Sequence, residues 1–133
     1  MVIDTSVLIA ILLDEPERDA FLRAIDAASS RLVSAMSKLE AGIVIVGRKG
    51  RAARGEVDLL MTKLAATVVP FDERQADIAR DAFARFGKGR HRAGLNFGDC
   101  AAYALAIAEA EPLLFKGADF GETDVEVVNA QSE

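Results

Sequence analysis

Hydrophobic and polar positions along the chain form two kinds of segment. Short apolar runs rich in Val, Ile and Leu predict buried strands, and longer runs with apolar residues at helical spacing predict helices. The predicted strands are MVID (1–4), RLVSA (31–35), ATVVPF (66–71), PLLF (112–115) and VEVVNA (125–130). The predicted helices are TSVLIAILL (5–13), EPERDAFLRAIDAA (15–28), MSKLEAGIVIVGR (36–48), EVDLLMTKLA (56–65), DERQADIARDAFARFG (72–87) and a helix that begins at Asp99.

Local signals predict where several helices begin, end and face. Asp72 is expected to cap the start of its helix, and Gly87 lies just past the end. The basic, glycine-punctuated stretch GRKGRAARG at 47–55 predicts a break. The helix before this break has an apolar stripe at helical spacing, which is expected to face the core. The stripe consists of Met36, Leu39, Ile43 and Val46.

The order of the elements predicts the architecture. Strands alternate with helices, and the strands are apolar along most of their length, which is typical of a mostly parallel sheet covered by helices on both faces. A chain of 133 residues is long enough for one core, so residues 1–133 are expected to form a single domain. In open parallel sheets, sites form beyond the carboxyl ends of the strands. Polar residues at or after strand ends are therefore the first candidates for chemistry.

Composition and charge narrow the possible functions. With 21 acidic and 16 basic residues, the net charge is -5, so a general nucleic-acid binder is excluded and any such contact must be local. The single cysteine excludes an internal disulfide and a multi-cysteine zinc site. The first residues lack the basic region of a signal peptide, and Asp14 and Glu15 interrupt the apolar run. We therefore expect a cytoplasmic protein with no membrane segment.

At two aspartates, the local sequence is compatible both with helix capping and with catalysis. Asp4 ends the first predicted strand and precedes a helix, so capping and catalysis are both open to it. Asp99 opens a helix that is apolar on nearly every side, so Asp99 is expected to be partly buried. The helix dipole stabilises an anion there by about 0.3 to 1 kcal/mol, which suits a cap without requiring an acid. The local sequence leaves both roles open at both positions.

Glu40 is the acid that local structure explains least. A surface glutamate in a helix is usually stabilised by about 0.2 to 0.5 kcal/mol through a basic residue three or four positions away. Because Glu40 also borders the apolar stripe, its carboxylate is expected to point toward the edge of the core. The neighbours of Glu40 three and four positions away are all non-basic: Met36, Ser37, Ile43 and Val44.

Asp119, in the glycine-flanked GADFG, is more typical of a turn.

Four blocks of sequence together resemble the PIN-domain family, and most closely its VapC-type ribonuclease toxins of bacterial toxin-antitoxin pairs. The blocks are VIDTSVL near the start, SKLEAG near one third, GLNFGDCAAYALA near three quarters and LLFKGADF beyond it. They follow the family's order and spacing from the first residue to about residue 124. The resemblance implies a three-layer α/β/α fold with a mostly parallel sheet of four to five strands.

The same resemblance implies which residues form the site. Asp4, Glu40 and Asp99 match the family's metal-binding acids, and Asp119 is the best match for a fourth catalytic acid. Many PIN sequences carry a further acid two residues before Asp119, where this chain has Gly117. Supporting roles fall to three polar residues, namely Thr5, Ser6 and Asn96.

The acids together imply a metal ion and phosphodiester chemistry. Two carboxylates roughly 4 Å apart repel by about 4 kcal/mol at an effective dielectric near 20, unless a cation lies among them. Oxygen ligands favour Mg²⁺ or Mn²⁺, and the lack of Cys and His clusters argues against zinc. Such an ion can activate water against a scissile phosphate and stabilise the departing oxygen. The resemblance thus implies a metal-dependent endoribonuclease.

An RNA substrate would need positive partners on this acidic protein. The loop KGRHRAGLNFG (88–98) leads directly to Asp99, so its basic cluster is the preferred candidate, with Lys116 beside Asp119 as another. A second basic cluster at 48–54 is more typical of a solvated loop. The preferred cluster consists of Lys88, Arg90, His91 and Arg92.

Partners and alternative functions complete the expectations. The resemblance implies a cognate VapB-type antitoxin that blocks the acidic pocket, a homodimer and a toxin-antitoxin hetero-oligomer. Apolar segments 6–13 and 38–46 are candidates for the antitoxin groove, although a buried core explains them more simply. An aspartate-dependent phosphohydrolase stays open as an alternative, but it needs an acid where the chain has Ser6. A catalytically silent PIN-fold binding module is the other alternative, and the intact acids argue against it.

Overall fold

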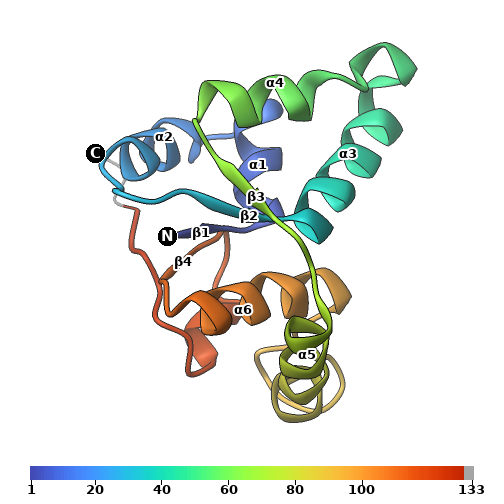
Figure 1. Ribbon diagram of the computed structural model, residues 1–133. Coiled ribbons are helices and arrows are strands. Elements are labelled where there is room, and N and C mark those ends of the chain that lie inside the picture. The colour runs from blue at the N-terminus through green and yellow to red at the C-terminus, as the bar shows by residue number, and fades with distance from the viewer. Residues whose placement is uncertain (131–133) are drawn as a thin grey trace.

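The sheet is parallel throughout, so the carboxyl ends of its strands share one edge. In the computed structural model, which describes residues 1–130, the strands follow the order β3-β2-β1-β4 (Figure 1). Every neighbouring pair is parallel. The expected mostly parallel sheet is confirmed. The strands are β1 (Val2–Ile3), β2 (Leu32–Ser34), β3 (Thr67–Val69) and β4 (Leu113–Leu114).

Helices cover both faces of the sheet and complete the expected three-layer α/β/α fold (Figure 1). One face carries α1 (Thr5–Leu12), α2 (Arg18–Asp26), α3 (Ala35–Lys49) and α4 (Glu56–Lys63). The other face carries α5 (Glu73–Phe86) and α6 (Phe97–Glu109). Two short 3-10 helices lie in connections, η1 (Arg51–Ala53) and η2 (Asp119–Glu122).

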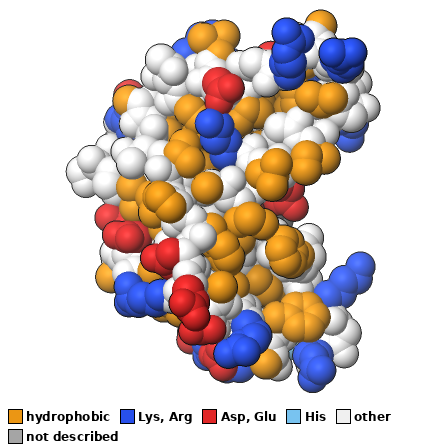
Figure 2. Space-filling model, turned by 45° about the vertical axis from the view of Figure 1, so that its right-hand side comes forward, with side chains coloured by type: hydrophobic (Ala, Val, Ile, Leu, Met, Phe, Trp, Pro, Cys, Tyr) orange, Lys and Arg blue, Asp and Glu red, His pale blue; other side chains and the backbone are white. Residues whose placement is uncertain are grey.

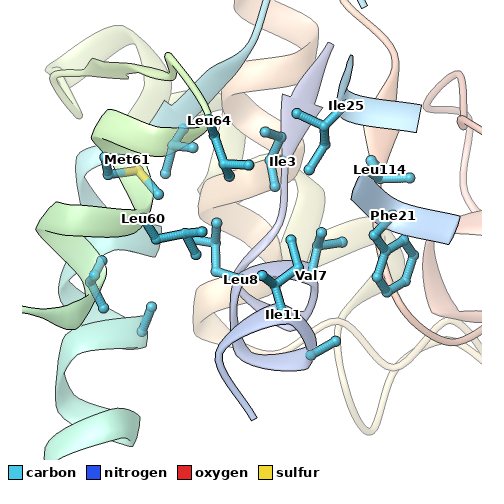
Figure 3. Close-up of a cluster of buried hydrophobic side chains, with 14 of the residues drawn as sticks. Ile3, Val7, Leu8, Ile11, Phe21, Ile25, Leu60, Met61, Leu64 and Leu114 are labelled. Atoms are coloured by element: carbon cyan, nitrogen blue, oxygen red, sulfur yellow. The ribbon is translucent and has the colours of Figure 1, made fainter. Parts of the chain in front are cut away.

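Each face of the sheet has its own buried cluster, because successive strand residues point to opposite faces. Ile3 and Leu114 join the cluster beneath α1 to α4 (Figure 3), whereas Val2 and Leu113 join the cluster beneath α5 and α6. All four are fully buried. Burial of each such side chain stabilises the fold by about 1.5 to 3 kcal/mol. This two-sided packing explains why the strands read as continuous apolar runs.

Helix α6 is buried along most of its length, as its apolar sequence predicts. Its residues from Cys100 to Ala106 are all buried. The helix begins at Phe97 and not at Asp99, because Asn96 is the N-cap. Burial raises the pKa of the Cys100 thiol to about 11, which fits a packing residue and not a nucleophile. Within the described part of the chain, no helix is long and apolar enough to cross a bilayer.

Helix ends follow the sequence signals closely, with one shift. Asp72 caps α5 and accepts a hydrogen bond from the Gln75 backbone N–H at 2.9 Å, as expected, and Gly87 follows the last helical residue. The predicted break at 47–55 is shorter than expected, because α3 continues to Lys49. Gly50 is the C-cap of α3, and its φ of 89° lies in the region that favours glycine.

The last predicted strand, 125–130, is wrong in extent. Only Val127 forms a bridge, parallel to Leu113. Two backbone hydrogen bonds flank it, from the Leu113 N–H to the Glu126 carbonyl and from the Val128 N–H to the Leu113 carbonyl, at 2.8 and 2.9 Å. Residues 125–130 therefore contribute an isolated bridge beside β4 and not a fifth strand.

The predicted core stripe of α3 is also wrong. Leu39 and Ile43 are 57% and 64% exposed. The buried face of α3 consists instead of Ser37, Ala41 and Ile45. Small side chains at the first two of these positions allow α3 to approach α1 closely, and Thr5 of α1 donates a hydrogen bond to the Ser37 carbonyl at 3.4 Å. The more hydrophobic stripe is left on the surface.

Candidate acidic cleft

A cleft of about 340 Å³ lies where β1 and β4 end, beside the first turns of α1 and α6. Asp4, Glu40 and Asp99 all line it, although they are far apart in sequence. We call this the acidic cleft. Three of the four predicted acids thus meet at the carboxyl edge of the sheet. The other lining residues are Thr5, Ser6, Ile9, Glu15, Val44, Asn96 and Lys116.

Asp4 is the N-cap of α1 and is 4% exposed. Its Oδ2 accepts hydrogen bonds from the Ser6 backbone N–H at 3.1 Å and from the Ser6 hydroxyl at 2.6 Å. Burial raises the pKa of Asp4 to about 6, the Ser6 hydrogen bonds oppose the rise, and the charges of Asp99 and Glu40 add to it. Asp4 is therefore both a cap and a desolvated acid beside two others.

Ser6 and Thr5 hold the surroundings of Asp4 in place. The Ser6 hydroxyl donates to Asp4 and accepts a hydrogen bond from the Lys116 backbone N–H at 2.9 Å. It therefore ties the start of α1 to the segment after β4. Thr5 ties the same helix to α3 through the Ser37 carbonyl.

Asp99 forms a capping box with Asn96 at the start of α6. The Asn96 Oδ1 accepts from the Asp99 backbone N–H at 2.9 Å, and the Asp99 Oδ2 accepts from the Asn96 backbone N–H at 3.0 Å. Burial raises the pKa of Asp99, and the charges of Asp119 and Glu40 raise it further. Asp99 thus combines capping with a place in the acidic cleft, and Asn96 orients it.

The Glu40 carboxylate lies directly against Gly98, the residue before Asp99. A Cβ atom at position 98 would overlap both carboxylate oxygens of Glu40. Glycine therefore allows α3 to bring Glu40 beside the first turn of α6. Gly98 had no predicted role, because the contact with Glu40 depends on how α3 packs against α6 and leaves no signal in the local sequence.

Negative charge in the acidic cleft lacks a free counter-charge among the described residues. Lys116 is the basic residue that lines the cleft, and its ammonium contacts Glu15 at 2.8 Å and Glu17 at 3.1 Å. Within residues 1–130, no three His, Cys, Asp or Glu side chains are grouped closely enough to hold an ion by themselves. Mg²⁺ usually takes only one or two carboxylates, with waters and substrate phosphates as its other ligands. The oxygen donors of the cleft suit such an open site.

Asp119 lies near the acidic cleft but does not line it. The residue is exposed and begins η2. Its charge contributes to the raised pKa of Asp99, so the two carboxylates interact electrostatically. Gly117 has φ of 104°, a conformation that disfavours any residue with a side chain. An acid at position 117 would therefore strain the backbone of this turn.

The predicted RNA-binding loop is exposed but partly engaged in internal contacts. Lys88 and Arg90 are exposed. Arg92 forms an ion pair with Glu122 at 2.7 Å. The His91 Nδ1 accepts a hydrogen bond from the Ala93 backbone N–H at 3.0 Å, and its ring packs edge-on against Phe86. His91 thus shapes the loop from within.

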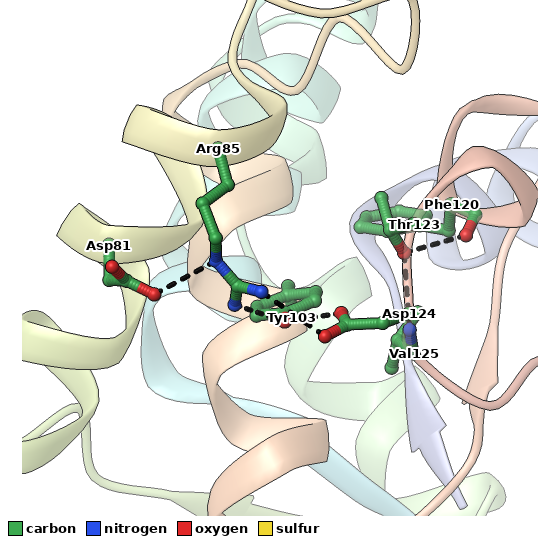
Figure 4. A network of polar contacts seen from close by, with 7 residues as sticks. All are labelled: Asp81, Arg85, Tyr103, Phe120, Thr123, Asp124 and Val125. Atoms are coloured by element: carbon green, nitrogen blue, oxygen red, sulfur yellow. Dashed lines mark hydrogen bonds and ion pairs between the residues drawn. The ribbon is translucent and has the colours of Figure 1, made fainter.

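A second polar cluster, which was not predicted from the sequence, lies around Tyr103 of α6, one helical turn after Asp99 (Figure 4). The buried Tyr103 hydroxyl donates to Asp124 at 2.6 Å and accepts from Arg85 at 3.0 Å. Arg85 also contacts Asp124 at 3.3 Å and Asp81 at 3.0 Å. We call these four residues the tyrosine network. The signal in the sequence was a tyrosine within the buried, alanine-rich part of α6, because a buried phenol needs a hydrogen-bond partner.

The fold and the acidic cleft define a PIN-domain protein, and comparison with known proteins agrees. The PIN domain profile matches residues 1–126, and the chain belongs to this family. Within it, the similarity is to VapC proteins, as the sequence blocks suggested. The Ribonuclease VapC of Mycolicibacterium smegmatis is 50% identical over 129 residues, covering 97% of this chain and 100% of that protein. The Ribonuclease VapC30 of Mycobacterium tuberculosis is 49% identical over 128 residues, covering 96% and 98%.

Solved structures share the fold at much lower sequence identity. VapC20 of Mycobacterium tuberculosis, described as a toxin that cleaves the sarcin-ricin loop, superposes with a TM-score of 0.78 at 14% identity, covering 96% of this chain and 98% of that one. A toxin-antitoxin complex from Klebsiella pneumoniae superposes with a TM-score of 0.73 at 15% identity, covering 99% and 98%. These matches support the three-layer architecture.

Proposed function

We propose that this protein is a Mg²⁺- or Mn²⁺-dependent endoribonuclease and the toxin of a VapBC-type toxin-antitoxin pair. The observation that carries the proposal is the convergence of Asp4, Glu40 and Asp99 in one cleft whose negative charge is not balanced by a free cation among the described residues. Perturbed carboxyl pKa values in a cleft are typical of functional sites. Relatives named as ribonucleases, about half identical along nearly the whole chain, supply the substrate class.

The divalent ion would be held by Asp4 and Asp99, with Glu40 as a further ligand or as the group that orients the attacking water. When bound, the ion would neutralise the carboxylates, make a bound water more acidic and stabilise negative charge on the phosphate. Ser6 keeps the Asp4 carboxylate facing the cleft, and Asn96 does the same for Asp99. Asp119 is proposed as the fourth acid, acting from the rim. Attack by water leaves a 5′-phosphate and a 3′-hydroxyl.

RNA phosphates are proposed to approach along the loop before α6. Lys88 and Arg90 extend into solvent there, and Arg92 lies beside them. The ammonium of Lys116 holds Glu15 and Glu17, so this residue would contact RNA only by exchanging those partners. Because the protein is acidic overall, binding should rest on a few local contacts and weaken as salt increases.

An antitoxin is proposed to cover the exposed apolar face of α3. Leu39 and Ile43 line a groove of about 710 Å³ between α3 and α4, together with Val57. Figure 2 shows hydrophobic side chains gathered on one face of the molecule around a hollow. The solved toxin-antitoxin complex with a similar fold, and the VapBC2 structure from Rickettsia felis, support a VapB-type antitoxin as the partner.

A homodimer is proposed through a second apolar pocket. Phe97 is 78% exposed and Phe83 is 41% exposed, and both line a pocket of about 440 Å³ between α5 and the start of α6. Exposed aromatic side chains on this scale are typical of protein interfaces. Sedimentation of Phe97→Ser as a monomer, with wild type as a dimer, is the expected result.

The central experiment is RNA cleavage by purified, antitoxin-free protein. Wild type with Mg²⁺ or Mn²⁺ is expected to cut single-stranded or structured RNA, and a chelator is expected to stop it. Asp99→Asn keeps a capping side chain but loses the charge, so cleavage should fall by about 100-fold or more. Asp72→Asn is the control, because Asp72 also accepts a backbone hydrogen bond at the start of a helix but lies outside the cleft.

Two outcomes would overturn this function. Intact RNA with wild type and either metal rules out the nuclease, and equal cleavage by Asp99→Asn rules out the acidic cleft as its site. Trapping of a phosphorylated Asp4 would favour the phosphohydrolase instead. RNA binding without any hydrolysis would favour the silent binding module.

A further inference from the structure

The turn that carries Asp119 is fastened to the rest of the molecule at its far end. Tyr103 of α6 and Arg85 of α5 both bind the Asp124 carboxylate, at 2.6 and 3.3 Å (Figure 4). Two residues earlier, Glu122 pairs with Arg92 at 2.7 Å. The segment after Asp119 is therefore held by both α5 and α6 and by the loop between them.

The turn is also held by internal hydrogen bonds and a buried side chain, so a shift at Asp124 is transmitted to Asp119. The Thr123 hydroxyl donates to the Phe120 carbonyl at 2.7 Å and accepts from the Val125 backbone N–H at 3.3 Å. Phe120, directly after Asp119, is 2% exposed and packs edge-on against Phe115 with ring centroids 5.0 Å apart. Asp119 thus projects from a turn with a buried anchor beside it.

Helix α6 connects this fastening to the acidic cleft. Tyr103 follows Asp99 by four residues, so both lie on the same side of the helix, one turn apart. Tyr103 is 1% exposed and belongs to the same buried cluster as Phe120. The Tyr103–Asp124 hydrogen bond is therefore the contact that links the Asp119 turn to the same face of α6 that carries Asp99.

We propose that Tyr103 is a positioning residue: by holding Asp124 it places Asp119 relative to Asp99 and so tunes the affinity of the acidic cleft for its divalent ion. The inference rests on the proposed function. A purely structural tyrosine would change stability and leave the affinity for the ion unchanged. Asp124 and Arg85 are about half exposed, so their ion pair adds little to stability and leaves positional control as the main consequence of the contact.

The test is a calorimetric titration of Mn²⁺ into antitoxin-free protein without RNA, followed by cleavage assays over a range of Mn²⁺ concentrations. Tyr103→Phe keeps the ring and removes the hydroxyl, and it is expected to weaken Mn²⁺ binding about tenfold or more. Cleavage at saturating Mn²⁺ should return to near the wild-type rate. Asp81→Asn is the matched control, because Asp81 contacts Arg85 without contacting the turn, and it should bind Mn²⁺ like wild type.

Each outcome decides the proposal. Wild-type affinity in Tyr103→Phe overturns it, and so does equal weakening in Asp81→Asn, which would indicate general loosening. If Tyr103→Phe fails to fold, the half-exposed Asp124→Asn carries the test and should weaken binding in the same direction. Wild type that neither binds Mn²⁺ nor cuts RNA overturns the proposed function and the positioning role together, whereas binding and cleavage without a difference between variants overturns the positioning role alone.

Discussion

Two groups of carboxylates lie along α6, one turn apart, and they differ in what surrounds them. Asp124 accepts hydrogen bonds from Tyr103 and Arg85, and these contacts hold its pKa below the usual value. Asp4 is buried beside other acids, and its pKa is raised to about 6. A carboxylate with partners stabilises the fold, whereas a desolvated carboxylate without a counter-charge destabilises it. Such a cost is typical of a site that is completed by a ligand.

Gly98→Ala is expected to have the largest effect, and it tests whether the acidic cleft depends on the position of Glu40. The added methyl group would displace the Glu40 carboxylate from the cleft, so RNA cleavage should fall by about 100-fold, equivalent to about 3 kcal/mol. The measurement is the cleavage rate at saturating Mg²⁺, with thermal unfolding to check the fold. Gly47→Ala is the control, because Gly47 is also helical and has open space around it. Similar rates in the two variants would show that the position of Glu40 does not matter.

Asp4→Asn tests how much the buried Asp4 carboxylate lowers the stability of the fold. The folded pKa of about 6 lies above the ordinary value of 3.8, so the folded state is favoured by protonation and loses stability as pH rises from about 4 to about 6. Without metal at pH 7.5, Asp4→Asn should be more stable than wild type by about 2 to 3 kcal/mol. At pH 4 the difference should largely disappear. Urea unfolding at both values measures it, and a less stable variant at pH 7.5 would contradict the assigned burial cost.

Asp124→Asn should give the opposite and smaller change. The folded pKa of Asp124 lies below its ordinary value, so its contribution is present above that value and is lost as pH falls through the folded pKa. Because the side chain is about half exposed, the expected loss at pH 7.5 is only about 1 kcal/mol, from weakened hydrogen bonds. The same urea experiment measures it. An increase in stability would remove the contrast with Asp4.

The sequence predicted the layers of the fold better than the faces of its helices. Strand and helix order follow from period and from caps such as Asp72, which are local. The face of α3 was predicted wrongly, because hydrophobicity favoured Leu39 and Ile43, whereas close packing selected the small residues Ser37 and Ala41. Small residues carry little hydrophobic signal, so their role depends on the neighbouring helix.

The sequence predicted those site residues whose local position or missing partner is unusual. Asp4 lies at a strand end, Asp99 lies in the first turn of a helix, and Glu40 lacks a local partner, so each could be singled out before the structure was known. The distance of Asp119 from the cleft and the pairing of Tyr103 with Asp124 could not. Both depend on how the turn after β4 packs against α6, which no local pattern specifies.

Tyr103 has a practical consequence for fluorescence measurements on this protein. It is the only tyrosine in a chain without tryptophan, so near-ultraviolet emission excited above the phenylalanine band comes from one hydrogen-bonded phenol. Burial and the bond to Asp124 raise the pKa of Tyr103 to about 12, so the phenol stays protonated across ordinary buffers. Its emission therefore provides a label-free optical probe of the junction between α6 and the Asp119 turn, readable during metal, RNA or partner titrations without any introduced dye.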